Sequence, residues 1–527
     1  METNILSILI FFPLLGVLGM FIAYMLKQSD IIFKYIALFT TSIQLLLTVW
    51  LYFNFDPAIL LSSDLSVNPV KFGVQLPWID NFNIQYFLGI DGLSAPLVLL
   101  TSLLMFICIL ASWNISKHVF AYFSLFLLLN TGMMGVFLSL DFFLFYIFWE
   151  VMLLPMYFLI GIWGGPERKY AAIKFFLYTL FGSVFLLLGM IALYYYSGIE
   201  SFNLIALISA APSISGELWG FQVKYLIWLA LFIGFAIKVP IFPFHTWLPL
   251  AHVEAPTSIS VILAGVLLKM GTYGLLRISY PLLPGEVVAF SYTLAILAVI
   301  NIIWGATNAI AQRDLKKMVA YSSISHMGYV LLGMAAVIST SPAGSQAGMN
   351  GAVMQMFNHG VITAMLFLLV GMLYDRAHHR WIAFPDDYDK PELAGQLGFG
   401  GVSNRMPVYS AFVMVAFFAG LGLPGLSGFI SEAFCFIGGF TVFRFLTVIG
   451  TLGILLNAVY FLRAYQRIFW GEEGASSKEL TDINLREIFI LIPLLLLVIG
   501  LGVYPAPLID IIEPAVQGII DTVQSVL

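Results

Sequence analysis

The chain reads Phe235-Ala-Ile-Lys238-Val-Pro240-Ile-Phe-Pro243 in the middle of an apolar segment, so a lysine stands two residues before a proline. Proline has no N–H to donate, so it interrupts the helix that the surrounding residues predict. A second apolar segment is interrupted in the same way and reads Leu421-Gly-Leu-Pro424-Gly-Leu-Ser-Gly-Phe-Ile-Ser-Glu432. A charge at the centre of a bilayer costs at least about 2.5 kcal/mol. Charges at two helix breaks therefore indicate a path for ions or protons through a membrane protein.

The composition is that of an integral membrane protein. Hydrophobic residues make up 61% of the 527 residues and charged residues only 10%, whereas soluble domains contain about 25% charged residues. The apolar stretches are about 20 residues long, the length of a membrane-spanning helix, and they lack the two-residue alternation of a β-barrel. We therefore expect an all-α integral membrane fold. The net charge of −5 suggests no nucleic-acid partner.

We predict about fourteen transmembrane helices, polar segments at 54–91 and 374–405, and a short, partly amphipathic tail after residue 505. Of the 23 Lys and Arg residues, 17 follow odd-numbered spans and 4 follow even-numbered spans, while Lys238 and Lys269 lie within spans. Because loops rich in basic residues favour the cytoplasmic side, we expect both termini to face the periplasm. The expected location is the inner membrane of a bacterium. The predicted spans are 4–25, 31–53, 92–112, 119–138, 141–161, 171–196, 223–243, 257–279, 286–308, 316–338, 347–373, 406–440 (broken), 444–467 and 486–504.

Ionisable side chains inside the predicted spans form the candidate site. Buried carboxylates and lysines in membranes usually face a partner or a watered cavity, and histidine titrates near neutral pH. An alternating series of such groups is what proton conduction requires. We predict a proton relay made of Glu150, Lys238, Lys269, His326, His359 and Glu432.

These residues also have structural interpretations, which the sequence leaves open. Glu150 could belong to an ion pair that holds helices together, and Lys174 is one possible partner. Lys238 could stand beside a simple kink and extend its ammonium group toward the membrane surface. His326 and His359 could be hydrogen-bonded core residues.

Motifs for cofactors are missing from the sequence. A metal site is the competing use of His245, His252 and Glu254, but prolines interrupt this segment and the zinc-binding spacing H-E-x-x-H is absent. Cys108 and Cys435 have no CxxC spacing, which excludes a cysteine-ligated iron–sulfur cluster within this chain. We therefore predict no metal and no cofactor in this chain.

A long segment resembles a known family. The chain reads Lys238-Val-Pro-Ile-Phe-Pro-Phe-His-Thr-Trp-Leu-Pro-Leu-Ala-His-Val-Glu-Ala-Pro-Thr257 and continues with Leu263-Ala-Gly-Val-Leu-Leu-Lys-Met-Gly271. These stretches, and Lys316-Lys-Met-Val-Ala-Tyr-Ser-Ser-Ile-Ser-His-Met-Gly328, are similar to the antiporter-like subunits of respiratory complex I. The resemblance covers roughly residues 85–470, and it is weak at 54–84 and in the C-terminal tail.

Within that family the chain resembles the M-type subunits. The second broken segment ends on Glu432, where the L- and N-type subunits carry a lysine. Asp91-Gly-Leu-Ser-Ala-Pro96 and Phe148-Trp-Glu-Val-Met-Leu-Leu-Pro155 also look like the M-type. An L-type subunit would continue past residue 527 into a long lateral helix.

The resemblance implies two inverted five-helix repeats, spans 4–8 and 9–13, with the broken spans 7 and 12 in matching places. It implies that Glu150 and Lys238 pair in the first half-channel, that Lys269 connects the halves, that His326 is a central relay and that Glu432 is the outlet. The implied parts of the chain are 1–118 with a periplasmic loop at 54–91, the first half-channel repeat at 119–280, the second at 281–470, and the last span with a periplasmic tail at 471–527.

The resemblance further implies a subunit of a proton-translocating NADH–quinone oxidoreductase, a translocase, which couples quinone reduction in partner subunits to proton transfer. FMN, iron–sulfur clusters and quinone are then expected in those partners. The chain would lie in a hetero-oligomer between L-type and N-type antiporter-like subunits, in contact with lipids. Alternatives are a subunit of an Mrp-type Na⁺/H⁺ antiporter, a subunit of a membrane-bound hydrogenase or ferredoxin-driven complex, and a purely structural scaffold.

Overall fold

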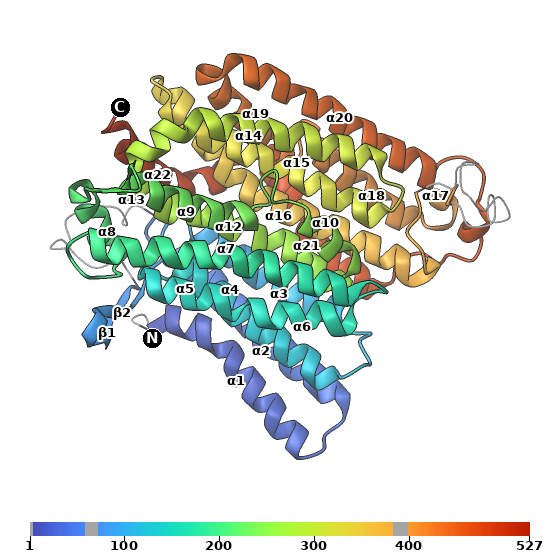
Figure 1. Cartoon of the computed structure of the whole chain (residues 1–527). Coiled ribbons are helices and arrows are strands. Elements are labelled where there is room, and N and C mark those ends of the chain that lie inside the picture. Colours follow the sequence, from blue (N-terminus) through green and yellow to red (C-terminus); the bar gives the residue numbers. More distant parts are fainter. Residues whose placement is uncertain (1–3, 58–71, 383–398) are drawn as a thin grey trace.

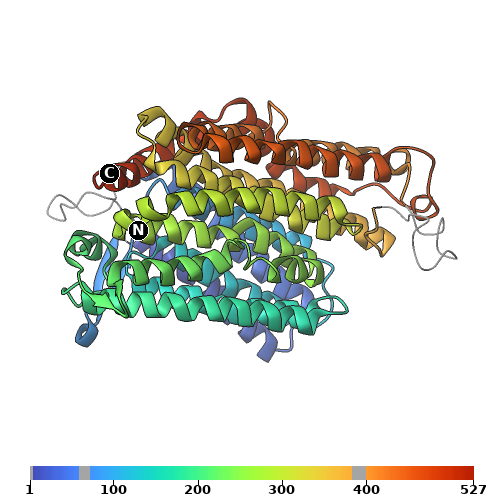
Figure 2. The same cartoon turned by 45° about the horizontal axis from the view of Figure 1, so that its top comes forward.

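The computed structural model describes residues 4–57, 72–382 and 399–527, which form a bundle of long helices along a common direction (Figure 1). The first helix begins and the last helix ends at the same end of this bundle (Figures 1 and 2). Within the described ranges, eleven helices are long and apolar enough to cross a membrane. The predicted all-α class is confirmed.

These eleven helices coincide with eleven of the predicted spans. Two of them are interrupted by local irregularities, which are described below. They are α1 (Ile5–Met25), α2 (Asp30–Asn54), α4 (Val119–Leu138), α5 with α6 (Phe142–Val151 and Leu153–Trp163), α7 (Arg168–Tyr196), α11 to α13 (Thr257–Ile262, Leu268–Gly274 and Tyr280–Leu282, joined by π segments), α14 (Pro284–Ala311), α15 (Leu315–Ala335), α16 (Pro342–Ala377), α20 (Arg444–Phe469) and α21 (Leu485–Val503).

The other three predicted spans are shorter or broken helices. Two of them divide where prolines and glycines predict a break, directly after Lys238 and a few residues before Glu432. The count of fourteen crossings and the two inverted repeats stay predictions, because length and composition identify only candidate spans. The helices are α3 (Ala95–Ala111), α9 (Val223–Lys238) followed by α10 (Trp247–Glu254), and α18 (Pro407–Gly420) followed by α19 (Ser427–Val442).

The fifth span was predicted as one continuous helix and is in fact divided at Met152. Pro155 stands four residues after Val151 and has no N–H to donate to its carbonyl, so the hydrogen-bond ladder is interrupted at this turn.

Part of the predicted polar loop 54–91 is an antiparallel hairpin of β1 (Val74–Ile79) and β2 (Ile84–Leu88). Pro77 lies within β1. In a two-stranded sheet both strands are edges, where proline is tolerated, and the register shifts between Pro77 and Ile79. Residues 58–71 and 383–398 of the two predicted polar segments lie outside the described residues.

The C-terminal tail is longer and more regular than predicted. It forms α22 (Ala506–Gln524), with Pro514 inside the helix. Its buried apolar residues recur at helical spacing and pack against the bundle. The short connecting elements are α8 (Leu204–Ala210), α17 (Val402–Arg405), β3 (Glu217–Leu218), β4 (Phe221–Gln222) and the 3₁₀ turns η2 (Asp80–Phe82), η3 (Ala211–Ser213), η6 (Ala336–Ile338) and η8 (Ala475–Ser477).

A buried ion pair fixes the start of α3 to the segment that follows Lys269. Arg277 Nη2 lies 2.5 Å from Asp91 Oδ1, and both side chains are almost completely buried. The backbone N–H of Ser94 also donates to Asp91 Oδ1, and Arg277 Nε donates to the hydroxyl of Tyr273. The two charges are therefore compensated and held by further hydrogen bonds.

We expect Asp91→Asn to lower the free energy of unfolding by about 3–5 kcal/mol, because Arg277 would stay buried without a counter-charge. The matched control is Asp314→Asn, which removes a partly exposed partner of Arg380 at 3.1 Å and costs about 1 kcal/mol or less. The measurement is the temperature at which half of the protein aggregates when native membranes are heated. Equal shifts in the two variants would contradict a special role of the buried pair.

Candidate functional site

The first helix break presents a lysine at a favourable helix end. Lys238 is the last residue of α9, and the carboxyl end of a helix favours a cation. Pro240 cannot donate to the carbonyl of Ala236, and the N–H of Ile241 takes its place at 2.9 Å. The chain can therefore leave the helix here without an unsatisfied carbonyl at Ala236.

Asn301 of α14 holds the turn that follows the break. Its Oδ1 accepts the N–H of Phe242 at 2.8 Å, and its Nδ2 donates to the carbonyl of Pro240 at 3.3 Å. Irregular backbone inside a membrane needs such polar partners. Asn301 was not among the residues predicted from the sequence. Its only signal there is an asparagine inside an apolar span, and in the structure its side chain is fully buried.

The ammonium group of Lys238 lies in an aromatic setting. Its Nζ is 5.2 Å from the ring centroid of Trp149 and 5.7 Å from that of Phe175, distances at which a ring face attracts a cation. Within the described part of the chain Nζ has no hydrogen-bond partner. Glu150 is the opposite charge that acts on it, although the two groups form no ion pair within 4.0 Å. The attraction between the two charges therefore acts across more than 4.0 Å.

Lys174, the other possible partner of Glu150, has a different environment. Its ammonium group lies 5.8 Å from the ring centroid of Tyr178, and its charge acts on His245. Among the described residues, Lys174 and Glu150 form no ion pair within 4.0 Å.

Lys269 lies on α12 between two π segments, η4 (Leu263–Leu267) and η5 (Leu275–Ser279). Segments of π-helix occur frequently at functional positions. The side chain is fully buried, and its Nζ donates to the carbonyl of Ala264 in the first π segment. The same Nζ lies 2.7 Å from Nδ1 of His359 on α16.

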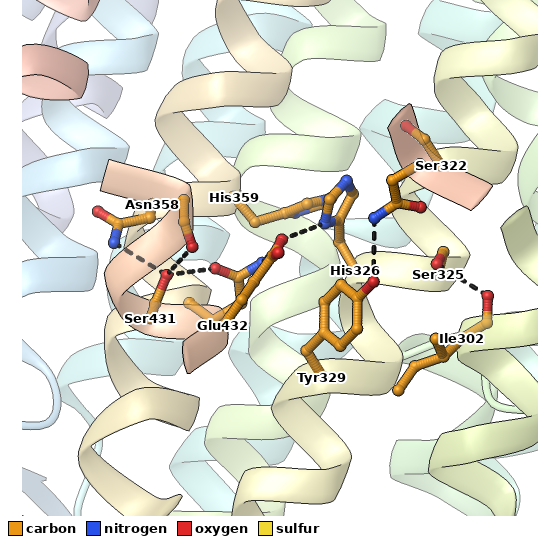
Figure 3. Close-up of polar contacts among 12 residues, drawn as sticks. Ile302, Ser322, Ser325, His326, Tyr329, Asn358, His359, Ser431 and Glu432 are labelled. Atoms are coloured by element: carbon orange, nitrogen blue, oxygen red, sulfur yellow. Dashed lines mark hydrogen bonds and ion pairs between the residues drawn. The ribbon is translucent and has the colours of Figure 1, made fainter. Parts of the chain in front are cut away.

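The contact with His359 continues toward the second helix break. The ring centroids of His359 and His326 are 5.5 Å apart, and His326 Nδ1 lies 3.0 Å from Glu432 Oε1 (Figure 3). Glu432 occupies the second turn of α19. Lys269, His359, His326 and Glu432 thus form a buried row from α12 to α19, which we call the central relay.

A small cavity lies beside the central relay. Its volume is about 10 Å³, which is close to the minimum that one water molecule needs. His326, His359 and Glu432 all line it. Within the described residues, His359 Nε2 has no hydrogen-bond partner, so a water molecule here would complete a continuous row of hydrogen bonds.

The glycine-rich break before α19 leaves space for the carboxylate of Glu432. Gly422 has a φ of +82°, which favours glycine, and a Cβ atom there would lie 2.8 Å from Glu432 Oε2. On the other side, Gln355 Nε2 lies 3.5 Å from Glu432 Oε1, and Ser431 Oγ donates to Gln355 Oε1 at 2.5 Å. The carboxylate is therefore confined by the break and by a polar network.

The three residues of the competing metal site have separate partners. Glu254 Oε2 accepts a backbone N–H at the start of α7, His245 Nε2 accepts the indole N–H of Trp304, and His252 stacks on Phe367. In residues 4–57, 72–382 and 399–527, no group of three or more His, Cys, Asp or Glu side chains is arranged to hold a metal ion.

His252 is a further candidate, which the sequence analysis considered only as a metal ligand. It is fully buried, and neither ring nitrogen has a partner among the described residues. The charges of both Lys269 and Lys316 act on it. Lys316 lines a cavity of about 360 Å³ together with Glu254, Asp375 and Arg380. His252 belongs to α10, whose last two residues, Val253 and Glu254, line this cavity.

The structure divides the six predicted residues into two groups. Four of them form the central relay, and the chain of contacts between them runs through His359. Glu150 and Lys238 form a separate pair near the first break. In the described part of the chain no side-chain hydrogen bond joins this pair to the central relay.

Sequence comparisons agree with the motifs. Residues 139–457 match the family described as "NADH:quinone oxidoreductase/Mrp antiporter, TM", and residues 65–140 match "NADH-ubiquinone oxidoreductase chain 4, amino terminus". The chain is 41% identical over 528 residues to NADH-quinone oxidoreductase subunit M of Rickettsia conorii, covering 99% of each chain. The similarity thus includes 65–84 and the C-terminal tail, which the sequence analysis regarded as only weakly similar.

Solved structures agree with the sequence comparisons. A chain of respiratory complex I from Thermus thermophilus with bound NADH superposes with a TM-score of 0.83 at 26% identity, covering 98% of this chain and 99% of that chain. A chain of the membrane-bound sulfane sulfur reductase, an archaeal respiratory membrane complex, has the same fold, with a TM-score of 0.79 at 21% identity over 99% of this chain and 100% of that chain. The chain belongs to the NADH:quinone oxidoreductase/Mrp antiporter transmembrane family.

Proposed function

We propose that this chain is a proton-translocating membrane subunit of an NADH–quinone oxidoreductase and that the central relay conducts the protons. The observation that carries the proposal is the buried row from Lys269 through His359 and His326 to Glu432. Amine, imidazole and carboxylate groups all exchange protons, and such groups inside a membrane mark proton pathways. The 41% identity to a protein named NADH-quinone oxidoreductase subunit M supports the assignment.

The two helix breaks set the environments of Lys238 and of Glu432. Lys238 stands at the carboxyl end of α9, which favours a cation, and Glu432 stands one turn inside α19 beside His326 and Gln355. In the first half-channel, Glu150 and Lys238 exchange a proton through water. Lys269 then passes protons to His359, from which they reach His326 and leave by way of Glu432.

The cavity beside Lys316 provides one entrance to the relay. It is open enough for several water molecules, with a volume of about 360 Å³. His252 carries two nitrogens without protein partners among the described residues and feels the charges of Lys316 and Lys269. In this proposal it transfers protons between the cavity and Lys269.

Redox chemistry takes place in partner subunits, which hold FMN, iron–sulfur clusters and quinone. The chain lies between L-type and N-type subunits in a bacterial inner membrane, with both termini in the periplasm. The excess of Lys and Arg after odd-numbered spans supports this orientation. The start of α1 and the end of α22 lie at one end of the bundle, which supports both termini on the same side of the membrane.

The test is proton movement by the purified complex in liposomes. With NADH and a short-chain quinone, we expect the lumen to acidify equally in sodium-free and sodium-containing buffer, and a protonophore to abolish the signal. The complex is expected to copurify with FMN and iron–sulfur chains. Acidification that needs a sodium gradient and proceeds without NADH, in a complex without those chains, would instead identify an Mrp-type antiporter.

A further inference from the structure

A basic cavity lies at the end of α20, apart from the central relay. Its volume is about 240 Å³, and its walls come from the end of α14, the start of α15 and the last two turns of α20. Three arginines line it, Arg313, Arg463 and Arg467, and no acidic side chain among the described residues does. We call it the arginine cavity.

Two of these arginines lack a counter-charge within the described ranges. Arg463 and Arg467 stand four residues apart on α20, both are exposed, and neither takes part in an ion pair there. Like charges at this spacing repel each other on a helix. The neighbouring acid Asp314 is already paired with Arg380. An anion from outside the chain would therefore relieve the repulsion between the two guanidinium groups.

An apolar stripe on α20 leads from the arginine cavity toward the middle of the helix. Leu452, Leu455, Val459 and Leu462 recur at intervals of three and four residues, so they share one face with Arg463, and all four are exposed. A free phosphate ion would not cover this apolar surface. A phospholipid would cover it with its acyl chain while its phosphate binds the guanidinium groups.

We propose that the arginine cavity binds the phosphate of an anionic phospholipid whose acyl chain lies along the exposed stripe of α20. Guanidinium groups match phosphate oxygens in geometry as well as in charge. Basic cavities between transmembrane helices on the cytoplasmic side are typical headgroup sites, and the end of α20 is on that side in the orientation proposed above. The site goes beyond proton translocation, because it contains no member of the central relay.

The experiment measures lipid binding to the lipid-depleted complex in mild detergent, by native mass spectrometry with added phosphatidylglycerol. We expect Arg463→Gln with Arg467→Gln to weaken binding of one phosphatidylglycerol by about 30-fold. Arg444→Gln is the matched control, because Arg444 is the first residue at the other end of the same helix, and it is expected to leave binding unchanged. The double variant Arg463→Lys with Arg467→Lys is expected to retain most of the phosphatidylglycerol binding.

Two further arms distinguish the sources of phosphate. Phosphatidylcholine and millimolar inorganic phosphate are expected neither to occupy the site nor to displace the anionic lipid. Displacement by inorganic phosphate alone would assign the site to a free anion and overturn the proposal. Full lipid binding by the double glutamine variant would overturn it as well.

A measurement on the unmodified complex covers the case in which the double glutamine variant fails to assemble. A phosphatidylglycerol with a photoreactive headgroup is expected to label the peptide that contains Arg463 and Arg467. Labelling that avoids this peptide would exclude the site.

Discussion

Lys238→Met is expected to lower proton translocation by about 100-fold or more, which is the usual contribution of a positioned proton-transfer group. Methionine keeps the apolar length of the side chain between Trp149 and Phe175 but cannot carry a proton. It also removes the charge that acts on Glu150. The measurement is NADH-driven acidification of liposomes that contain the purified complex, together with the rate of quinone reduction.

Lys169→Met is the control for Lys238→Met. Lys169 is an exposed lysine in the first turn of α7, so its loss tests the general effect of removing one positive charge. We expect this variant to pump normally. Normal pumping by Lys238→Met in a fully assembled complex would refute the role of Lys238 and would favour a structural scaffold.

His359→Phe is expected to have an effect of similar size, because it cuts the central relay in its middle. Phenylalanine occupies a similar volume, but it offers Lys269 no acceptor in place of Nδ1 and cannot bridge to His326. A buried ammonium that loses such a partner costs about 1–3 kcal/mol, so the protonated form of Lys269 becomes harder to reach. Proton translocation is the readout, with complex assembly checked by native electrophoresis.

His359→Gln separates conduction from packing at the same position. Glutamine supplies an acceptor oxygen for Lys269, but it does not titrate. If His359 only positions Lys269, the glutamine variant recovers translocation; if His359 carries protons, both variants fail, and we expect the second result. His379→Phe serves as the control, because His379 is a loop histidine whose ring also stacks on an aromatic side chain, Phe399.

The sequence predicted the helix breaks and the charges beside them because these depend on local chemistry. Two closely spaced prolines after Lys238, and a proline flanked by glycines before Glu432, favour a helix break from the local sequence alone. The contact between Lys269 and His359 depends on tertiary packing instead, since the two residues are 90 positions apart. Nothing local to either residue determines that distance.

The residues that the sequence analysis missed share a reason. Asn301 was not predicted and His252 was considered only as a metal ligand; both stand in largely apolar helices, and only the fold reveals what faces them. The hairpin of β1 and β2 lies in a segment that was predicted to be a polar loop, and α22 lies in what was predicted to be a short, partly amphipathic tail. The hairpin accommodates Pro77 because both of its strands are edges, and α22 buries its apolar residues against the bundle.

The hydrogen bonds of Asn301 have a mechanical consequence. Asn301 belongs to α14, in the predicted second repeat. Its side chain forms hydrogen bonds with the peptide groups of Pro240 and Phe242, which follow Lys238 in the predicted first repeat. These two hydrogen bonds tie α14 to the turn that follows Lys238, so a shift of α14 would displace this turn together with it. The environment of the lysine is thereby coupled to the position of a helix that begins more than 40 residues further along the chain.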